Sequence, residues 1–317
     1  MKVLIVTIIF CAASVLAIQN GIAVNDSTLY PYFVDIGNPH VCGGAFISLE
    51  PETWVLTAAH CVADGKLPPP SPNPYYVSYG HVTRSNQKTE YIANWTVHPK
   101  YQTSGNDDPD MHYDVALVKL THPVKKSTTV SRIAIAKTSE TVGENSVASV
   151  MGVGYTGYNL PQSPELLHML VNISKYKPET TDMIETKPAD TSAVCHGDSG
   201  GPLIKRSPWT GQPSLLGVLS RIFNAYDPDP MNATCPKAFN SNSTPSTDGY
   251  VNIPNLLPWI SEITKLSVEQ LTAIPEAPSL TEQARMENVL ANQANPHISA
   301  SMFITSICIF VISLFYQ

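Results

Sequence analysis

Apolar positions in the middle of the chain come in short runs separated by Pro, Gly, Asn and Asp. The runs are rich in branched and aromatic residues, which is typical of β-strands joined by turns. They cover 32–36, 45–47, 54–57, 75–79 and 115–120 in the first half, and 147–153, 166–173, 215–220 and 250–253 in the second. Many short strands of this kind indicate an all-β barrel or sandwich.

Helical periodicity first appears late in the chain. Residues 255–264 predict one terminal helix, with Pro258 near its start. Residues 267–292 follow with several Pro and Glu and no strand pattern, so we expect a stalk there. A helical portion of that stalk is expected near 281–290.

The N-terminus has the pattern of a secretory signal peptide. Lys2 is followed by an apolar run over 3–10 and then by small residues up to Ala17. We expect 1–17 to be removed by a cut after Ala17, with Ala13 as the alternative. A buried N-terminal helix is the weaker interpretation, because the run stands at the extreme terminus.

The C-terminus has the pattern of a glycolipid (GPI) anchor signal. An apolar run over 302–316 stops one residue before the end, and it is shorter than the about 20 residues that a spanning helix needs. A polar spacer over 293–301 and small residues precede it. We expect attachment at Asn292 and removal of 293–317. The alternative is a tail-anchored transmembrane helix.

Composition limits the function classes. With 43% hydrophobic and 14% charged residues, the chain is expected to fold rather than stay disordered. The net charge of -7 and the scattered bases argue against nucleic-acid binding, which needs clustered Lys and Arg. No acidic loop predicts a calcium site.

Cysteines and glycosylation motifs agree with secretion. Of the 6 cysteines, Cys11 falls in the signal and Cys308 in the tail. Four remain, which predicts two disulfides with three possible connectivities: Cys42, Cys61, Cys195 and Cys235. Their spacing does not favour a zinc site. Five Asn-x-Ser/Thr motifs are expected to carry glycans: Asn25, Asn94, Asn172, Asn232 and Asn242.

Three short motifs contain residues suited to nucleophilic catalysis. They are Thr57-Ala-Ala-His60-Cys61, Asp114-Val-Ala-Leu and Gly197-Asp-Ser199-Gly-Gly-Pro202. Taken alone, the first motif is explained by a core or surface histidine, the second by an aspartate in a turn, and the third by a tight loop. Together, in the order His, Asp, Ser, they predict a serine nucleophile activated by a histidine base. A lipase-type hydrolase has the order Ser, Asp, His and is therefore not favoured.

With these motifs, the sequence resembles the chymotrypsin/trypsin family of serine endopeptidases from about residue 18 to about residue 266. The stretches 40–47, 98–101, 217–220 and 258–260 add to the resemblance. It implies an all-β fold of two packed antiparallel β-barrels with a C-terminal helix. The first barrel would span 18–133, and the second barrel with the helix 134–266.

The resemblance implies a role for each motif. Ser199 would attack the peptide carbonyl, His60 would act as the base, and Asp114 would orient the imidazole. The amides of Gly197 and Ser199 would form the oxyanion hole. Cys42 would pair with Cys61, and Cys195 with Cys235. Substrates would be proteins or peptides, protein protease inhibitors would be potential partners, and no cofactor would be needed.

The resemblance also indicates the primary specificity pocket. Ala193 would lie at its base, where trypsin-like members have Asp, with Val194 beside it. Ser220 and Ile222 would line it, and Ile222 would narrow its entrance. We expect a small or medium aliphatic residue before the scissile bond. The alternative is Lys or Arg, read by Asp248 on another wall, because a buried unpaired carboxylate needs a partner or a raised pKa.

Activation departs from the family pattern. Ile18 resembles the new N-terminus whose ammonium pairs with the aspartate before the nucleophile, here Asp198. A Lys or Arg normally precedes that Ile, but none lies between Lys2 and Lys66. We therefore hypothesise that signal peptidase itself creates the active N-terminus. Gln19 stands where the family usually has Val.

The sequence thus predicts a secreted, surface-anchored serine endopeptidase at the cell exterior. The rival hypothesis is a non-catalytic homologue that serves as a surface binding module, since a fold does not guarantee its function.

Overall fold

The computed structural model describes 17–37, 42–63, 75–101, 111–138, 142–143, 145–157, 160–177, 180, 183–223, 235 and 247–275. The expected signal peptide up to residue 16, the stalk beyond 275, the anchor signal with Asn292, and the motifs at Asn232 and Asn242 lie outside these ranges. None of the helices within them is long and apolar enough to cross a bilayer.

The first half of the chain forms a closed antiparallel barrel. Its strands are β2 (Phe33–Ile36), β3 (Cys42–Ser48), β4 (Trp54–Thr57), β5 (Tyr76–Tyr79), β6 (Lys88–Val97) and β7 (Ala116–Leu120). They follow the order β2-β3-β4-β7-β6-β5 around the ring. Most of these strands coincide with predicted apolar runs. The exception is β6, whose polar and half-exposed residues give no apolar pattern.

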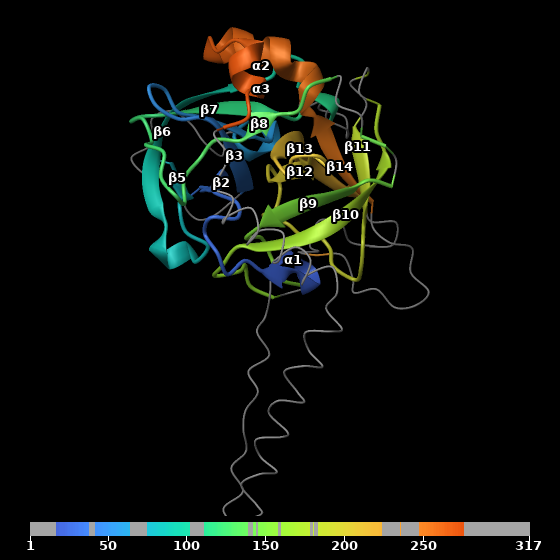
Figure 1. Cartoon of the computed structure of the whole chain (residues 1–317). Helices are drawn as coiled ribbons and strands as arrows, with labels where there is room; N and C mark the ends of the chain where they lie inside the picture. The colour runs from blue at the N-terminus through green and yellow to red at the C-terminus, as the bar shows by residue number, and fades with distance from the viewer. Residues whose placement is uncertain are drawn as a thin grey trace, which may run out of the picture.

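The second half forms a second ring beside the first (Figure 1). Its strands are β9 (Val147–Gly152), β10 (Leu167–Lys175), β11 (Ile184–Pro188), β12 (Pro202–Arg206), β13 (Pro213–Phe223) and β14 (Thr247–Asn252). The ring closes because β9 pairs with both β12 and β10. Two short strands extend this sheet: β1 (Ile22–Ala23) pairs with β10, and β8 (Ala134–Ile135) runs parallel to β13.

The two barrels and the terminal helix confirm the predicted fold class. One apolar cluster combines residues of both halves, such as Phe46, Leu56, Val218 and Ile253, so the barrels share a continuous core. A second cluster fills the second barrel. Short 3-10 turns in the described ranges lie at Ala59–Cys61 (η1), Arg84–Asn86 (η2), Met111–Tyr113 (η3) and Ile253–Leu256 (η4).

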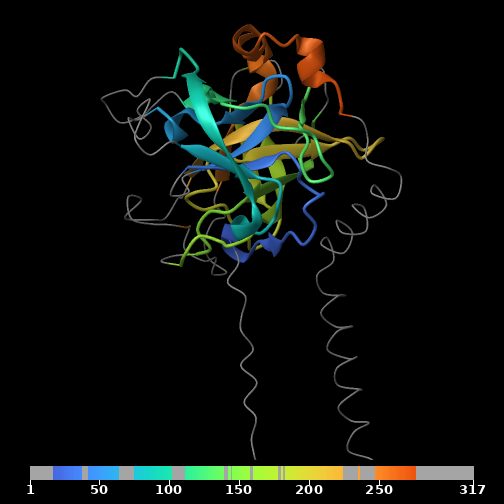
Figure 2. The ribbon, with the colours of Figure 1, turned by 90° about the vertical axis from the view of Figure 1, so that its left-hand side faces the viewer.

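Helices α2 (Leu257–Thr264) and α3 (Val268–Thr272) lie together over one end of the barrels (Figure 2). α3 falls at the start of the expected stalk and differs from it. Ser267 and Gln270 form a reciprocal capping box at its N-terminus. Leu271 is fully buried, and Arg132 Nη2 donates to the Ala273 carbonyl at 2.7 Å. The packed domain therefore extends to at least residue 273.

Candidate active site

The first barrel brings His60 and Asp114 together. His60 lies on η1 directly after β4, and Asp114 lies between η3 and β7, which is paired with β4. The Asp114 side chain is 0% exposed and accepts three hydrogen bonds. The donors are His60 N at 2.8 Å, His60 Nδ1 at 2.7 Å and Ser220 Oγ at 2.6 Å. A carboxylate held in this way fixes the tautomer and orientation of the imidazole.

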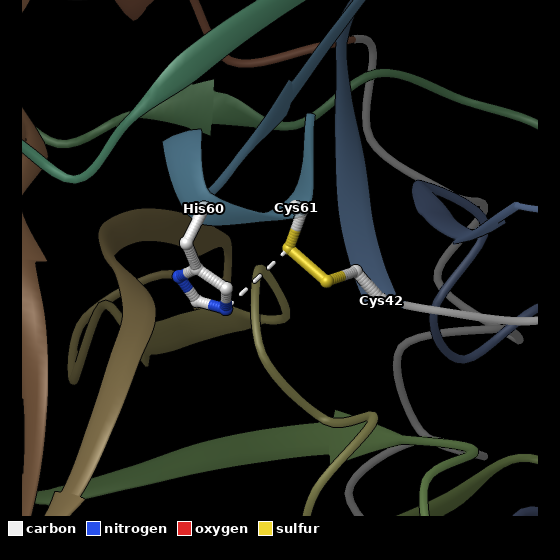
Figure 3. A group of neighbouring side chains, drawn as sticks. All are labelled: Cys42, His60 and Cys61. Carbon is white, nitrogen blue, oxygen red and sulfur yellow. Dashed lines mark hydrogen bonds between the residues drawn. A yellow bond between two sulfur atoms is a disulfide. The ribbon is translucent and has the colours of Figure 1, made fainter. Parts of the chain in front are cut away.

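A disulfide holds the turn that carries His60 (Figure 3). Cys61 is bonded to Cys42 on β3, and His60 Nε2 lies 3.8 Å from Cys61 Sγ. Donor atoms of Cys42, His60 and Cys61 lie within 4.8 Å of one another. The two sulfurs are already bonded to each other and are not thiolates, so this group does not suit a metal ion.

The loop with Ser199 lies between β11 and β12 and is bonded to both barrels. Gly43 N donates to the Ser199 carbonyl at 2.8 Å, and Gly200 N donates to the Leu219 carbonyl at 2.8 Å. Gly200 has a φ of 79°, and a Cβ there would collide with the Thr57 hydroxyl and the Gly43 carbonyl. Only glycine therefore lets this loop approach the first barrel so closely.

Ser199 is partly exposed, and the His60 side chain is 28% exposed. Within the described ranges, Ser199 Oγ forms no hydrogen bond with His60. Such bonds are often long before substrate binds. The Gly43–Ser199 hydrogen bond and the Cys42–Cys61 disulfide nevertheless connect the serine loop with the histidine turn through adjacent residues of β3.

Asp198 is buried beneath the serine loop. Its carboxylate accepts hydrogen bonds from Gly154 N at 2.9 Å and from Cys195 N at 2.8 Å. A Cβ on Gly154 would lie 2.7 Å from Asp198 Oδ1, so the carboxylate occupies space that only glycine leaves. Gly197 has a φ of 90°, and the Cys195–Cys235 disulfide forms next to it. The two expected disulfides are thus confirmed.

The N-terminal segment docks on the second barrel. Ile18 is 0% exposed and belongs to the same apolar cluster as Val194. The Gln19 carbonyl accepts a hydrogen bond from Ala193 N at 2.9 Å. Ile18 has a φ of 45° inside the one-turn segment α1 (Ala17–Asn20), a strained region for a β-branched residue. Its nitrogen here is a peptide amide joined to Ala17, so no ammonium faces Asp198.

Strand β13 connects Asp114 with residues that are expected to line the pocket. Ser220 on this strand donates to Asp114, and Ile222, two residues further on, pairs with Asp248 on β14. Ala193 and Val194, by contrast, are buried on the loop before Cys195. The sequence placed Ser220 only among substrate-binding residues and missed its contact with Asp114.

Asp248 differs from the other buried carboxyls of the site. It is 0% exposed, and neither side-chain oxygen has a hydrogen-bond partner. Burial raises its pKa to about 8, with a smaller contribution from the negative charge of Asp198. The carboxyl is therefore mostly protonated at neutral pH.

An aromatic cluster behind Asp114 was not predicted as part of the site. His98 is buried and stacks on Tyr113, with ring centroids 4.8 Å apart. Trp259 of α2 packs edge-on against His98, also at 4.8 Å. The signals for it were His98-Pro-Lys-Tyr101 and Pro258-Trp-Ile260, which contributed only to the family resemblance.

The described glycosylation motifs differ in accessibility. Asn25 and Asn94 are exposed, whereas Asn172 is half-buried on β10, where it pairs with Lys187 and Val147. Of the three, Asn25 and Asn94 remain the better candidates for glycans.

Comparisons with known proteins identify related chains. The family model described as trypsin matches residues 18–241. The chain is 31% identical to serine protease SP24D of Anopheles gambiae, over 71% of this chain and 72% of that protein. It is also 31% identical to serine protease 28 of Mus musculus, over 57% of this chain and 69% of the relative.

A solved structure has the same fold. It is neuropsin, a serine protease expressed in the limbic system of mouse brain, with a TM-score of 0.59. The match covers 78% of this chain and 100% of neuropsin at 21% sequence identity. At that identity, the likeness supports the two-barrel architecture alone.

Proposed function

Because the chain belongs to the trypsin family of serine proteases, we propose that it is an active serine endopeptidase that uses Ser199, His60 and Asp114. The hydrogen bond of 2.7 Å between Asp114 and His60 Nδ1 carries the proposal. It leaves His60 Nε2 as the ring nitrogen that takes a proton.

The reaction follows from these positions. Ser199 Oγ attacks the scissile carbonyl while His60 Nε2 takes its proton. The same proton passes to the leaving amine, and an acyl-enzyme remains on Ser199. Water then attacks the ester with His60 again as base. The amides of Gly197 and Ser199 stabilise the oxyanion, and each donor of this kind contributes roughly 3–4 kcal/mol.

We assign to the pocket a preference for a small or medium aliphatic residue before the scissile bond. Ala193 and Val194 support it because they are buried and apolar, and Ile222 supports it because it packs on the apolar cluster of the second barrel. The alternative is Lys or Arg bound at Asp248. Strong preference for a basic residue, abolished by Asp248→Ala, would reverse the assignment.

We further propose that a signal-peptidase cut after Ala17 activates the enzyme. The strained φ of 45° at buried Ile18 supports a cut there, because cleavage releases the backbone constraint and creates an ammonium. That ammonium would pair with Asp198. N-terminal sequencing of active secreted protein is expected to give Ile18, and a start at Ser14 would contradict the proposal.

The proposed location is the cell surface, through a GPI anchor near Asn292, with a transmembrane tail as the alternative. Release of the protein from cells by a phospholipase specific for such anchors is the expected result. Retention after complete phospholipase treatment would favour the transmembrane tail.

The direct test of activity is covalent labelling with a fluorophosphonate probe. The full chain expressed through the secretory route is expected to label, and Ser199→Ala is expected not to label. Ser207→Ala, a serine on the β12–β13 hairpin, is the matched control and should label like the wild type. Absence of labelling in folded protein that starts at Ile18 would favour a non-catalytic binding module.

A further inference from the structure

Asp248 lies close to the catalytic centre from two directions. Along β13, it pairs with Ile222, two residues after Ser220, which contacts Asp114. From the serine loop, the charge of Asp198 acts on it, and Asp198 directly precedes Ser199. The Asp248 carboxyl is therefore next to the strand that carries Ser220 and close to the aspartate that precedes Ser199.

Among the residues that the structure describes, none is a partner for the Asp248 carboxyl. Thr186 on β11 pairs with Asp248, and Tyr250 lies two residues after Asp248 on β14. Both residues are fully buried. Among the described residues, no Lys or Arg forms an ion pair with Asp248. A buried carboxyl with both oxygens unpartnered points to a group that arrives from outside.

The charged groups near Asp248 explain why it stays unpaired. Strand neighbours alternate between the two faces of a sheet, so residues beside Ile222 and Thr186 point away from the face of Asp248. The titratable groups on the elements packed against β14 are Arg221 on β13, Glu185 and Lys187 on β11, and His112 and Tyr113 on η3. Asp198 is the charge that acts on Asp248, and Tyr250 shares its strand.

We propose that Asp248 gives the pocket two selectivities, accepting a small uncharged side chain when its carboxyl is protonated and Lys or Arg when it is ionised. The proposal rests on the proposed function, because it describes substrate choice at the same site. It unites the two specificity hypotheses as two states of one pocket.

The two protonation states place different demands on the substrate. Neutral Asp248 leaves a pocket that is apolar at Ala193, Val194 and Ile222, so a charged substrate group would stay uncompensated. Ionised Asp248 is itself a buried charge, and a substrate cation supplies both its counter-charge and its missing hydrogen bonds.

Burial and then the charge of Asp198 raise the pKa of Asp248 to about 8, so its change of protonation state falls at mildly alkaline pH. In the cleaved enzyme, an Ile18 ammonium beside Asp198 would offset part of that repulsion. The transition is then expected at or somewhat below about pH 8.

The test is the selectivity between two peptide substrates that differ only before the scissile bond, Ala in one and Lys in the other. The ratio of their kcat/KM values is measured between about pH 6 and pH 9.5, where the substrate Lys stays charged. Any pH effect that is common to the two substrates cancels in the ratio. The Lys/Ala ratio is expected to rise by up to about tenfold per pH unit across this range, because the ionised fraction of Asp248 grows while the protonated fraction falls.

Variants test whether Asp248 is the group that causes the pH dependence of the Lys/Ala ratio. Asp248→Asn is expected to prefer Ala and to give a ratio that does not change with pH, and Asp248→Ser is the second variant should the first not fold. Glu185→Gln, on the adjacent strand and opposite face, is the matched control and should keep the wild-type profile. A flat ratio in the wild type, or a pH-dependent ratio in Asp248→Asn, overturns the proposal.

Labelling by the fluorophosphonate probe distinguishes failure of the selectivity proposal from failure of the proposed function. Wild-type enzyme that labels and shows a flat ratio refutes the selectivity proposal alone. Folded wild-type enzyme that starts at Ile18 and does not label refutes the proposed function and this inference with it.

Discussion

Each barrel contributes a fully buried carboxyl to the site, and the two differ in their partners. Asp114 at the start of β7 accepts three hydrogen bonds, two of them from His60. Asp248 on β14 of the second barrel accepts none. Both side chains are 0% exposed, so the difference comes from local donors and not from depth.

The comparison shows how hydrogen bonding decides what a buried acid does. Hydrogen bonds from His60 and Ser220 fix the position of the Asp114 carboxyl, which suits a group that orients a base. Without donors, burial favours the neutral form of Asp248 and raises its pKa, so its charge depends on pH. The first barrel therefore supplies a fixed acid, and the second supplies an adjustable one.

The largest expected effect separates the two acids by activity. Asp114→Asn should lower kcat by about 10⁴-fold, because the amide cannot hold His60 in the required tautomer. Asp248→Asn should keep kcat for an Ala substrate within about tenfold, because it leaves the triad intact. Steady-state kinetics of both variants with the Ala substrate check this. Equal losses would remove the functional distinction between the barrels.

The next effect concerns stability. The pKa of Asp248 is about 8 in the folded protein against an ordinary value of 3.8. Between these values the folded chain keeps a proton that the unfolded chain has lost, so the free energy of unfolding falls by on the order of 1 kcal/mol per pH unit. Asp248→Asn removes that loss. In urea unfolding, the free energy of unfolding of the variant should increase relative to that of the wild type as the pH rises from about 4 to about 8.

A gain for Asp248→Asn that is the same at about pH 4 and at about pH 8 would show that the charge of Asp248 is not its cause. Glu185→Gln serves again as the control, since its side chain bonds Lys175 at the surface of the same sheet.

His168 is expected to give the opposite pH dependence of stability, in which the free energy of unfolding falls as the pH is lowered. His168 on β10 accepts or donates a hydrogen bond with Tyr30 at 2.9 Å and is 1% exposed. Burial and then Arg206 lower its pKa to about 4 from 6.5. Because the unfolded chain binds the proton first, stability is lost as pH falls from about 6.5 to about 4.

His168→Gln keeps a partner for Tyr30 and removes this titration. The difference in free energy of unfolding between variant and wild type should therefore shift in favour of the variant by on the order of 2–3 kcal/mol across that window. Thermal melts at several acid pH values measure it. An unchanged difference would mean that other groups cause the acid sensitivity.

The smallest expected effect concerns the contact between the barrels. Arg84 donates to Asp35 at 2.9 Å and to the Ser163 carbonyl at 3.4 Å, which links the first barrel to the second. Arg84→Met should cost about 1 kcal/mol, because the arginine is partly exposed and Asp35 has further interactions. A loss larger than that of removing the His60 turn disulfide, about 3 kcal/mol, would show that this contact holds the barrels together.

Local sequence was enough to predict much of this molecule. Apolar runs located β2, β4, β5 and β7 within a residue or so, since barrel strands bury branched side chains. Pairing of cysteines, which arithmetic left open, followed from the family resemblance and is confirmed. The motifs at 60, 114 and 199 lie on three separate loops, of which the structure directly joins His60 and Asp114.

The rest depends on contacts that sequence does not encode locally. β6 is polar on much of its length because it faces solvent, so no alternation marked it. α3 was taken as part of the stalk, since a single buried Leu271 in a polar segment is too weak a pattern. Whether Asp248 has hydrogen-bond partners depends on how β11, β13 and β14 pack together, so its unpartnered state is visible only in the folded chain.

The position of α3 has a mechanical consequence. A pull on the chain beyond residue 275 reaches the domain first at the Arg132–Ala273 hydrogen bond and at buried Leu271. Further inside, Trp259 of α2 packs against His98, which stacks on Tyr113. Tyr113 directly precedes Asp114 in the chain. Tension applied beyond residue 275 is thus expected to open α3 before it disturbs Asp114.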